Sequence, residues 1–393
     1  MFTLARESAL LVSCPKGLAP WVAQEMREMG YEAAEMEAGV RSTGALADCL
    51  RLNLRLRCGH RVHYRLKRFG AMHPDMVYRE VNALPWEEIF APDGYFSVHS
   101  AVEHPSIRDT RFPNLRVKDA VADRFAAKAG RRPDSGPDQG RGVTLFLYWR
   151  GPKAELHLDT SGIPLPRRGY RLHPHSAPMQ ETLAAAVLRA AGWDPATHLV
   201  NPMCGSGTLA IEAALMARNI APGLLREDFA FRWLREFDPA AWEDLRRQAR
   251  QEILPRARGR IIATDHDPAA LEAARANARQ AGVEADIEFA LCDFRDTPVP
   301  DGPGAVLVNP EYGQRLGDAA ELGGVYQGLG DFLKRSCAGY RAGVFTAAPD
   351  LAKRIGLRPE RKVPFRSAKL ACMLLLYSLW EGPRRRDASA PAP

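Results

Sequence analysis

The feature that most constrains this chain is a glycine-containing turn at residues 199–208, between an apolar stretch and an expected helix. We expect the strand at 198–200 and the helix at about 209–217, with Gly205 and Gly207 in the turn. Glycine lets the backbone approach a ligand closely because no Cβ stands in the way. In a doubly wound sheet such a turn lies at the carboxyl end of its strand, where ligands bind. Taken alone, the turn fits a ligand loop and a plain turn about equally well.

A second motif follows about one hundred residues later. The expected strand 304–308 leads directly into Asn309, Pro310, Glu311 and Tyr312. An Asn oxygen and a proline carbonyl can accept hydrogen bonds from a planar amine, while an aromatic ring stacks on the base. The two motifs together resemble class I S-adenosylmethionine-dependent methyltransferases of the N-P-P-Y type, which methylate exocyclic or amide nitrogens. Glu311 stands where that pattern has its second proline.

Length and charge narrow the class of protein. A chain of 393 residues predicts two or three domains. The net charge of +7 and the pI of about 9.1 favour a polyanionic partner, with a solvated arginine-rich surface as the alternative. No apolar run approaches the roughly 20 residues of a membrane helix, and the first residues do not resemble a signal peptide. We therefore expect a cytoplasmic protein that does not bind membranes.

Cysteines and histidines give no sign of a metal site. The seven cysteines are scattered without a C-x-x-C pair, which favours a reducing compartment over disulfides or zinc. Neither His60 with His63 nor His173 with His175 has a second ligand pair at zinc spacing. We expect no bound metal.

The first 160 residues alternate short expected strands and helices. Strands are expected at 9–12, around Val40, and at 61–69, 95–100, 143–149 and 155–159, and helices at 18–29, 45–54, 76–84 and 114–128. The stretch 61–69 alternates apolar and basic residues, which predicts a half-buried strand whose basic face meets water or RNA. Residues of roughly 40–160 form a small expected α+β unit without a nucleophile, metal cluster or phosphate loop, and the absence of these groups favours a binding module.

In the second half, an acidic residue ends the strand expected at 260–264. Asp265 at that point is suited to accept hydrogen bonds from both ribose hydroxyls of an adenosine. Asp267 lies next to it, but Pro268 follows, and the pair fits the N-cap and first turn of a helix at 269–281. We therefore assign Asp265 to the ribose and Asp267 to the cap.

The next expected strand, 286–291, is also followed by an acid. The Asp293 carboxylate can accept a hydrogen bond from an adenine amine, and Phe294 can lie beside the ring. Acids at two successive strand ends favour a nucleotide site over surface charge. Late strands are expected at 344–346 and 371–379, and a helix at 331–337.

Two stretches between these motifs have mixed interpretations. The connector 163–176 is rich in proline and arginine, and it fits a solvated linker or an RNA-backbone contact equally. The stretch 218–259 is an insertion that carries aromatic residues and a helix capped by Asp238. We expect its aromatics, which are Phe229, Phe231 and Trp233, to be core rather than base-stacking residues.

The order of three further segments extends the resemblance. Residues 117–120, 156–162 and 167–171 are similar to THUMP-containing RNA methyltransferases, and most of all to bacterial 23S rRNA guanine-N2-methyltransferases. The resemblance covers about 8–381. It implies an α/β chain with a ferredoxin-like segment (1–40), a THUMP RNA-binding domain (41–162), a linker (163–178), a Rossmann-like, seven-stranded class I methyltransferase domain (179–382) and a disordered tail (383–393).

The resemblance also implies the site. S-adenosylmethionine is the expected cofactor, and Asn309, Pro310 and Tyr312 are the expected catalytic residues. The expected cofactor-binding residues are Asn201, Met203, Cys204, Gly205, Ser206, Gly207, Thr208, Asp265, His266, Asp293 and Phe294. The expected substrate-binding residues are Glu311, Arg315, Arg167, Arg168 and Arg171. Two positions besides Glu311 depart from the family pattern: Thr182 replaces an Asn, and Gln314 replaces an acid.

The expected reaction is methylation of the exocyclic N2 amine of a guanosine in 23S rRNA. Hydrogen bonds from that amine to Asn309 Oδ1 and the Pro310 carbonyl would direct its lone pair toward the methyl group and stabilise the charge that develops. A paired base cannot enter such a site, so the target is unpaired or flipped out. Glu311 could accept from guanine N1–H, or could face solvent.

Three alternatives remain at this stage. A tRNA guanine-N2 enzyme shares both the chemistry and the THUMP module. A DNA adenine or protein glutamine methyltransferase shares the N-P-x-Y chemistry alone. A ribosome-assembly factor that binds RNA with weak or lost transfer is favoured only by Glu311, Gln314 and Thr182.

Overall fold

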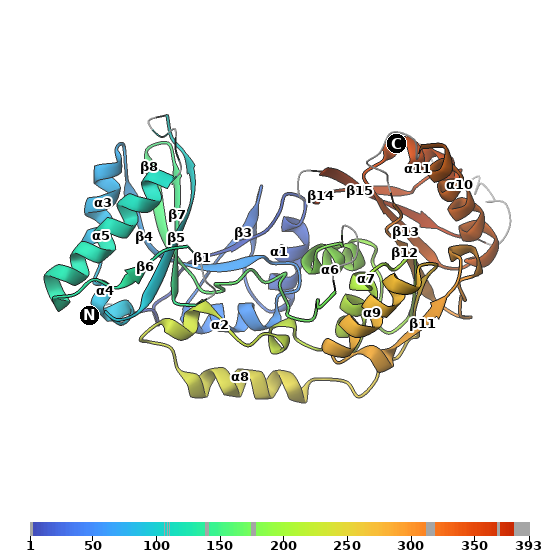
Figure 1. Cartoon of the computed structure of the whole chain (residues 1–393), viewed down its shortest axis with the longest axis horizontal. Helices are drawn as coiled ribbons and strands as arrows, with labels where there is room; N and C mark the ends of the chain where they lie inside the picture. Colours follow the sequence, from blue (N-terminus) through green and yellow to red (C-terminus); the bar gives the residue numbers. More distant parts are fainter. Residues whose placement is uncertain are drawn as a thin grey trace, which may run out of the picture. The chain divides into compact units, whose positions relative to one another are not determined.

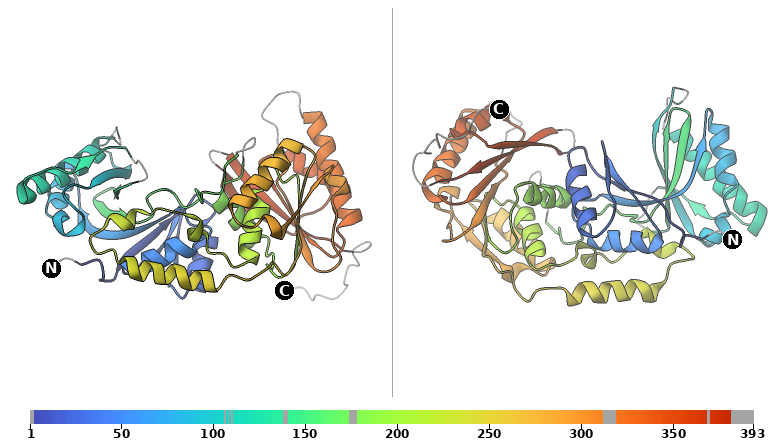
Figure 2. Two further views of the ribbon diagram at one scale, coloured as in Figure 1. Left: turned by 60° about the horizontal axis from the view of Figure 1, so that its bottom comes forward. Right: turned by 180° about the vertical axis from the view of Figure 1, so that it is seen from behind.

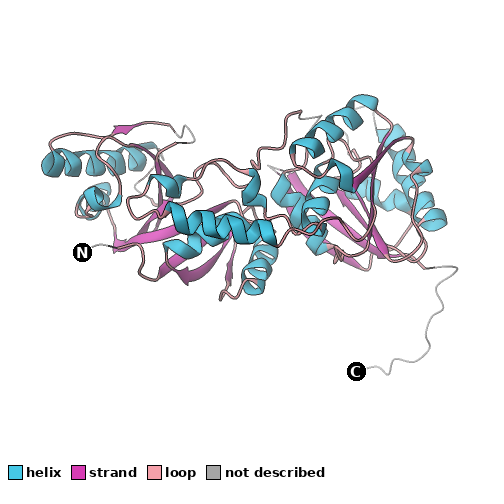
Figure 3. Ribbon diagram, turned by 90° about the horizontal axis from the view of Figure 1, so that it is seen from below, coloured by secondary structure: helices cyan, strands magenta, loops and turns pink. Residues whose placement is uncertain are grey.

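The chain folds into two compact units (Figure 1). In this computed structural model, the described residues are 3–105, 107, 109, 111–137, 141–173, 178–311, 319–367 and 370–380. Unit 1 comprises Met1–Arg168 and Ile220–Ile253, and unit 2 comprises Gly169–Asn219 and Leu254–Pro393. Each unit contains one mixed β-sheet with helices packed against it (Figure 3). The expected mixed α/β class is confirmed.

The sheet of unit 1 has the strand order β2-β3-β1-β4-β8-β7-β5-β6. Its strands are β1 (Ser8–Ser13), β2 (Ala34–Met36), β3 (Gly39–Gly44), β4 (Arg61–Gly70), β5 (Tyr95–Glu103), β6 (Asp134–Ser135), β7 (Val143–Arg150) and β8 (Lys153–Asp159). Neighbours are antiparallel except that β5 runs parallel to β6 and β7. The expected strands of this half all occur, whereas β2 and β6 are short strands that the periodicity did not indicate.

Helices cover the apolar side of this sheet. They are α1 (Ala19–Glu28), α2 (Leu46–Arg55), α3 (Pro74–Asn82), α4 (Trp86–Ile89) and α5 (Arg111–Ala129). Helix α1 has a proline in its first turn and is followed by Gly30, whose φ of 90° suits the chain reversal. The rings of Trp86, Phe90 and Phe125 are buried together in the core beneath the helices.

Strand β4 is the expected half-buried strand. Its cations, which we expected to meet water or RNA, also pair with acids. The ion pairs to the neighbouring strand β8 are Arg61–Asp159, Arg65–Glu155 at 3.8 Å and Arg68–Glu155 at 3.5 Å. His63, on the same face, is only 2% exposed. Charge alternation along one strand cannot reveal acids on its neighbour.

The inserted stretch folds with unit 1. It contains η1 (Pro222–Leu225), η2 (Ala230–Trp233) and α8 (Pro239–Gln251), and α8 runs beside α2 in both views of Figure 2. Asp238 Oδ1 accepts from the amides of Ala240 and Ala241, so the expected cap is confirmed. Phe229 and Phe231 are buried as expected, whereas Trp233 is 46% exposed. Sequence reasoning had kept this stretch within 179–382.

The sheet of unit 2 has the strand order β11-β10-β9-β12-β13-β15-β14. Its strands are β9 (His198–Pro202), β10 (Ile261–Asp265), β11 (Ile287–Leu291), β12 (Gly304–Val308), β13 (Arg341–Thr346), β14 (Arg361–Ser367) and β15 (Leu370–Ser378). The first five in this order are parallel, and β15 runs antiparallel between β13 and β14. The expected seven strands are present, with β14 added to those that the sequence indicated.

The helices of unit 2 are α6 (Glu181–Ala190), α7 (Thr208–Ala217), α9 (Pro268–Gln280), α10 (Ala319–Ser336) and α11 (Pro349–Ala352). Short 3-10 turns occur at η3 (Glu284–Asp286), η4 (Phe294–Asp296) and η5 (Lys353–Ile355). The central strands β9, β10 and β12 are buried on both faces, which is the pattern of a parallel sheet covered on each side. Polar groups that serve a ligand must therefore lie at the strand ends.

Candidate functional site

The predicted motifs meet at one edge of the sheet of unit 2. Strand β9 lies between β10 and β12, with Val200 paired to Ile262 on one side and to Val306 on the other. All three strands run the same way, so the loops that follow them leave from the same edge. The glycine turn, Asp265 and Asn309 are therefore neighbouring groups rather than separate signals.

The turn after β9 has a backbone that suits a ligand loop. Met203, Gly205 and Gly207 have φ values of 53°, 54° and 79°, in the left-handed region. A Cβ built on Gly205 would meet no atom within 4 Å, so open space lies beside this backbone. Around it, the side chains of Cys204, Ser206 and Thr208 are buried. A ligand can thus approach the main chain of the turn directly at Gly205.

Gly207 has a different role from Gly205. A Cβ there would lie 2.9 Å from Cβ of Ala274 on α9, closer than real Cβ atoms come. We expect Gly207→Ala to lower the free energy of unfolding of unit 2 by about 2–3 kcal/mol, since strain at positive φ adds to the clash. Urea unfolding would measure the change.

Gly282→Ala is the matched control for this substitution. Gly282 also has positive φ, at 72°, but a Cβ there would meet nothing within 4 Å. It should lose only the cost of backbone strain, about 1 kcal/mol. Equal losses for the two variants would show that close packing on α9 is not the reason for glycine at 207.

Asp265 holds the turn from the end of β10. Its two carboxylate oxygens accept from the amides of Gly205 at 2.9 Å and Asp267 at 3.0 Å, and the residue is 7% exposed. Each oxygen keeps a lone pair for a further donor. Asp267 accepts from the Ala269 amide as the N-cap of α9, which confirms the expected cap. His266, which we expected to bind the cofactor, is exposed.

The acid after β11 is placed less deeply. Asp293 accepts from the amide of Arg295 at 2.9 Å and pairs with its guanidinium, and its side chain is 44% exposed. Phe294 is buried in the core of unit 2, and the guanidinium of Arg295 lies 4.6 Å from its ring centroid. An adenine amine could still reach Asp293, but the ring of Phe294 is already covered.

Two buried asparagine oxygens lie at this edge without a partner among the described residues. Asn201 donates from Nδ2 to the carbonyl of Leu307 at 2.8 Å, so it ties β9 to β12, while its Oδ1 accepts nothing. Asn309 Oδ1 is likewise buried and unpartnered. A buried acceptor without a donor costs about 1–3 kcal/mol, so each is a position where a ligand donor would be favourable. Pro310 is buried, and Glu311 is exposed.

Three expected positions of this motif, Tyr312, Gln314 and Arg315, lie outside the described residues. The three arginines of the connector that we expected to bind substrate lie in three different environments. Arg167 is exposed. Arg168 is 1% exposed, and its guanidinium donates to the carbonyls of Leu165 and Arg57. This geometry favours a structural role for Arg168.

Arg171 contacts the glycine turn rather than solvent. It donates to Glu181 Oε1 at 3.1 Å, to Ser206 Oγ at 3.3 Å and to the carbonyl of Met179 at 2.8 Å. Burial raises the pKa of Glu181, and the charge of Arg171 opposes that rise. Arg171 therefore joins the connector, α6 and the glycine turn within unit 2.

Asn277 is a site residue that sequence reasoning missed. Its Oδ1 accepts from the amides of Leu172 and His173, and its Nδ2 donates to the carbonyls of His173 and Ser206. The side chain is fully buried on α9. The available signal was an asparagine at a core-facing position of an alanine-rich helix, where a polar group needs partners.

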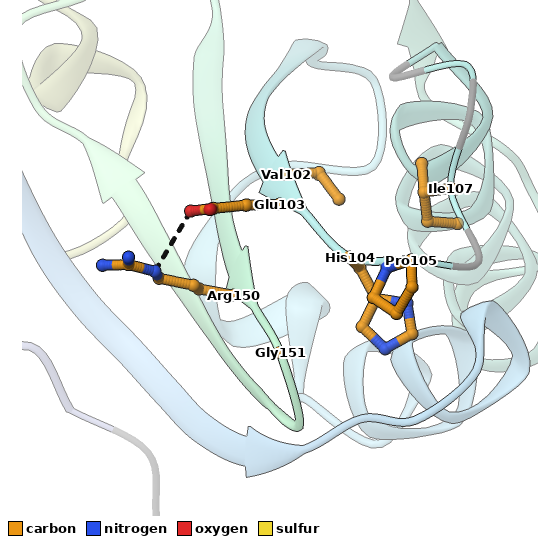
Figure 4. A pocket seen from close by; sticks show the side chains of 7 residues that line it. All are labelled: Val102, Glu103, His104, Pro105, Ile107, Arg150 and Gly151. Atoms are coloured by element: carbon orange, nitrogen blue, oxygen red, sulfur yellow. Dashed lines mark ion pairs between the residues drawn. The ribbon is translucent and has the colours of Figure 1, made fainter.

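A cavity elsewhere does not belong to this edge. It lies in unit 1, has a volume of about 610 Å³, and is lined by Val102, Glu103, His104, Pro105, Ile107, Arg150 and Gly151 (Figure 4). Arg150 pairs with Glu103 at 3.0 Å, and His104 stacks on Trp149. None of the predicted site residues is among those that line it.

The described residues contain neither a candidate metal site nor a candidate membrane span. Within the described part of the chain, no group of three or more His, Cys, Asp or Glu side chains could hold a metal ion. None of the described helices has both the length and the apolar character that a membrane span requires.

Comparison with known proteins identifies the family of this chain. A family model described as "RMKL-like, methyltransferase domain" matches residues 168–375, more than half of the chain. The chain belongs to the RMKL-like methyltransferase family. Two further models, described as "RlmL ferredoxin-like domain" and "THUMP domain", match residues 9–63 and 73–135.

Relatives of this RMKL-like chain carry related names. It is 39% identical to the "Ribosomal RNA large subunit methyltransferase K/L" of Syntrophotalea carbinolica, over 97% of this chain and 54% of that protein. It is 34% identical to a "Putative RNA methyltransferase" of Synechocystis, over 93% of this chain and 95% of the relative. The chain thus spans about half the length of the K/L relatives that it matches.

Solved structures confirm the fold of the RMKL-like chain over nearly its whole length. A putative methyltransferase called SMU.472, in complex with SAH, has a TM-score of 0.87 at 25% identity and covers 98% of this chain. A predicted N6-adenine-specific DNA methylase from Listeria monocytogenes has a TM-score of 0.84 at 31% identity and covers 95%. The whole of the first chain and 97% of the second are matched.

The cofactor of this family is S-adenosylmethionine, whose demethylated product is SAH. The described residues fit it. The open space at Gly205 accommodates a ligand against the backbone, Asp265 can accept from hydroxyls, and Asn201 Oδ1 awaits a donor. These three observations lie at the ends of the adjacent strands β9 and β10.

Proposed function

We propose that this chain methylates the exocyclic N2 amine of a guanosine in 23S rRNA. The observation that carries the proposal is the buried, unpartnered Oδ1 of Asn309, which directly follows the central strand β12. An exocyclic amine is the donor that such an oxygen lacks. The relatives named for the large ribosomal subunit, together with the THUMP match, support rRNA as its source.

The chain's own residues would act by alignment. S-adenosylmethionine supplies the electrophilic methyl group when it is bound. Asn309 Oδ1 and the Pro310 carbonyl would accept the two N–H groups of the amine and turn its lone pair toward the methyl group, which is mainly a gain from positioning. The same two oxygens would stabilise the positive charge that builds on nitrogen.

Arg167, which is exposed, would contact the RNA backbone, and we propose the same for Arg315. Tyr312 would stack on the target base. The buried Arg168 would hold the connector, and the paired Arg171 would hold the glycine turn. Asp265 and Asp293 would accept from the ribose and the adenine amine of the cofactor.

The test is in vitro methylation followed by nucleoside analysis. The purified chain would be incubated with labelled S-adenosylmethionine in three separate reactions, which contain 23S rRNA, tRNA or DNA. We expect N2-methylguanosine in 23S rRNA alone. The same nucleoside in tRNA would reassign the substrate, and methyladenine in DNA would refute the guanine assignment. No product with any substrate would favour the binding-only alternative.

Glu311 allows a narrower test of base choice. If its carboxylate accepts from guanine N1–H, Glu311→Pro should lower transfer to guanosine by about 10-fold or more, the value of one good hydrogen bond to a charged group. Single-turnover rates would be measured on RNA oligomers that carry guanosine or 2-aminopurine ribonucleoside, which lacks N1–H. This comparison separates loss of the hydrogen bond to N1–H from a general loss of activity. An unchanged rate and an unchanged preference for guanosine would remove the recognition role.

A further inference from the structure

One hairpin of unit 2 extends past the edge of the sheet where Asn309 lies. Strand β13 ends at Thr346, which pairs with Met373, but β15 continues back to Leu370. Three further residue pairs join it to β14 there, ending at Ser367 with Leu370. At about 3.4 Å per residue, the hairpin of β14 and β15 projects about 10 Å beyond β13. Figure 1 shows both strands at the end of this sheet.

The register gives the position of this hairpin relative to the proposed site. Val308 pairs with Val344, so Asn309 is level with the next residue of β13, Phe345. Strand β14 is three strands from β12 in the sheet. With about 4.8 Å between strands, Arg366 lies roughly 17 Å from Asn309, measured along the sheet and toward its ligand edge. RNA that presents a nucleotide to Asn309 could reach this distance within a few nucleotides.

The exposed face of β14 carries positive charge. Lys362, Pro364 and Arg366 alternate along the strand and are all exposed, whereas Phe365 between them is buried against Phe345. Neither Lys362 nor Arg366 makes a side-chain hydrogen bond or ion pair with any residue that the structure describes. Arg260, by contrast, is exposed but its charge is paired with Glu288.

Strand β14 is also unsuited to pair with another strand. It is the last strand of its sheet, and Pro364 removes a backbone donor from it. Proline and charged side chains on an edge strand block the addition of a further strand. What this face offers to a partner is therefore its charge, and a polyanion is the complementary partner.

We propose that Lys362 and Arg366 bind the phosphodiester backbone of the substrate RNA close to the methylated nucleotide. The inference rests on the proposed function, because it names how the same RNA is held. The two side chains would neutralise phosphates without reading bases, so they would supply affinity and position rather than sequence choice.

The test is a double substitution, Lys362→Gln with Arg366→Gln, which removes both charges and keeps most of both side chains. We expect the KM for RNA and the Kd from binding without cofactor to rise about 5–20-fold at low salt. The slope of log affinity against log salt should fall by about 1.4–1.8, because two fewer counterions are displaced. The kcat at saturating RNA and the Kd for S-adenosylmethionine should not change.

Arg335→Gln is the matched control. Arg335 is exposed and makes no ion pair with the described residues, but it lies in the last turn of α10, before β13, at the opposite edge of the sheet. It should leave KM and the salt slope unchanged. The Lys362→Arg with Arg366→Lys variant, which keeps both charges, should bind RNA like the wild type.

Unchanged RNA affinity and salt slope in the double variant would overturn the proposal, and so would equal losses in Arg335→Gln. The binding measurement separates failure of the hairpin proposal from failure of the proposed function. If the wild type binds RNA through the hairpin but yields no methylated nucleoside, only the function falls. If it methylates RNA and the double variant does so with unchanged KM, only the hairpin proposal falls.

Discussion

Asn309→Ala is expected to slow methyl transfer to RNA by about 10²–10³-fold, the usual cost of removing one donor or acceptor aimed at developing charge. The reason is that Asn309 Oδ1 is buried and has no partner within the described structure, so the substrate amine would be its sole hydrogen-bond donor there. Because the contact strengthens as nitrogen becomes positive, the loss should fall on kcat rather than on KM. Single-turnover kinetics with saturating RNA and cofactor would measure it.

Two controls make this result specific. The Kd for S-adenosylmethionine should stay within about twofold of the wild type, since removal of one uncharged side-chain amide that does not hold the glycine turn leaves Asp265 in place. Asn82→Ala, which removes an amide that donates to Ala120 in unit 1, should leave the rate unchanged. A normal kcat in Asn309→Ala would place the reacting amine elsewhere.

Unit 1 is expected to lose stability as the pH falls below 6.5. Burial lowers the pKa of His63 to about 4. The charge of Asp159 opposes this shift, and the charges of His157, Arg61 and His99 add to it. An unfolded histidine titrates near 6.5, so between these values the unfolded chain binds a proton that the folded chain does not. The contribution is complete above 6.5 and is lost on the way to 4. At pH 5 the loss amounts to about 2 kcal/mol for His63.

His157 changes the stability in the same direction, because burial lowers its pKa too, although its contact with Glu155 opposes the shift. Urea unfolding between pH 7.5 and 5 would show the loss, and hydrogen exchange of peptides from β4 and β8 would assign it to unit 1. His63→Leu, which cannot titrate, should reduce the pH slope by about one proton's worth, 1.4 kcal/mol per pH unit. The same slope in that variant would exclude His63 as the source.

Much of unit 2 could be read from the sequence because its signals are local. In the apolar runs that lead to Asp265 and Asn309, the strand and the polar residue at its carboxyl end lie within a few residues of each other. A parallel sheet then brings the successive strand ends together. Likewise, Asp238 and Asp267 were predictable as caps, since each is followed by a proline that starts the helix.

What could not be predicted depends on contacts distant in sequence. The charges on β4 are paired by acids that arrive almost one hundred residues later, as Arg61 with Asp159 shows. Burial of Arg168 depends on carbonyls such as that of Arg57, 111 residues away. No periodicity records such partners. The edge strand β14 escaped notice because it holds a proline and several charges, which lower the β-propensity of the segment.

The return of residues 220–253 to unit 1 has a consequence for how this protein is made. These residues complete unit 1 through contacts such as Phe231 N to Thr160 O at 3.1 Å and Arg226 Nη2 to Ile163 O at 2.7 Å. A ribosome must synthesise the first strand and helices of unit 2 before it synthesises residues 220–253. Unit 1 therefore cannot finish folding until residue 253 has been made, when part of unit 2 already exists. Near residue 200 both units are incomplete, so a nascent chain stalled there should be sensitive to protease in both.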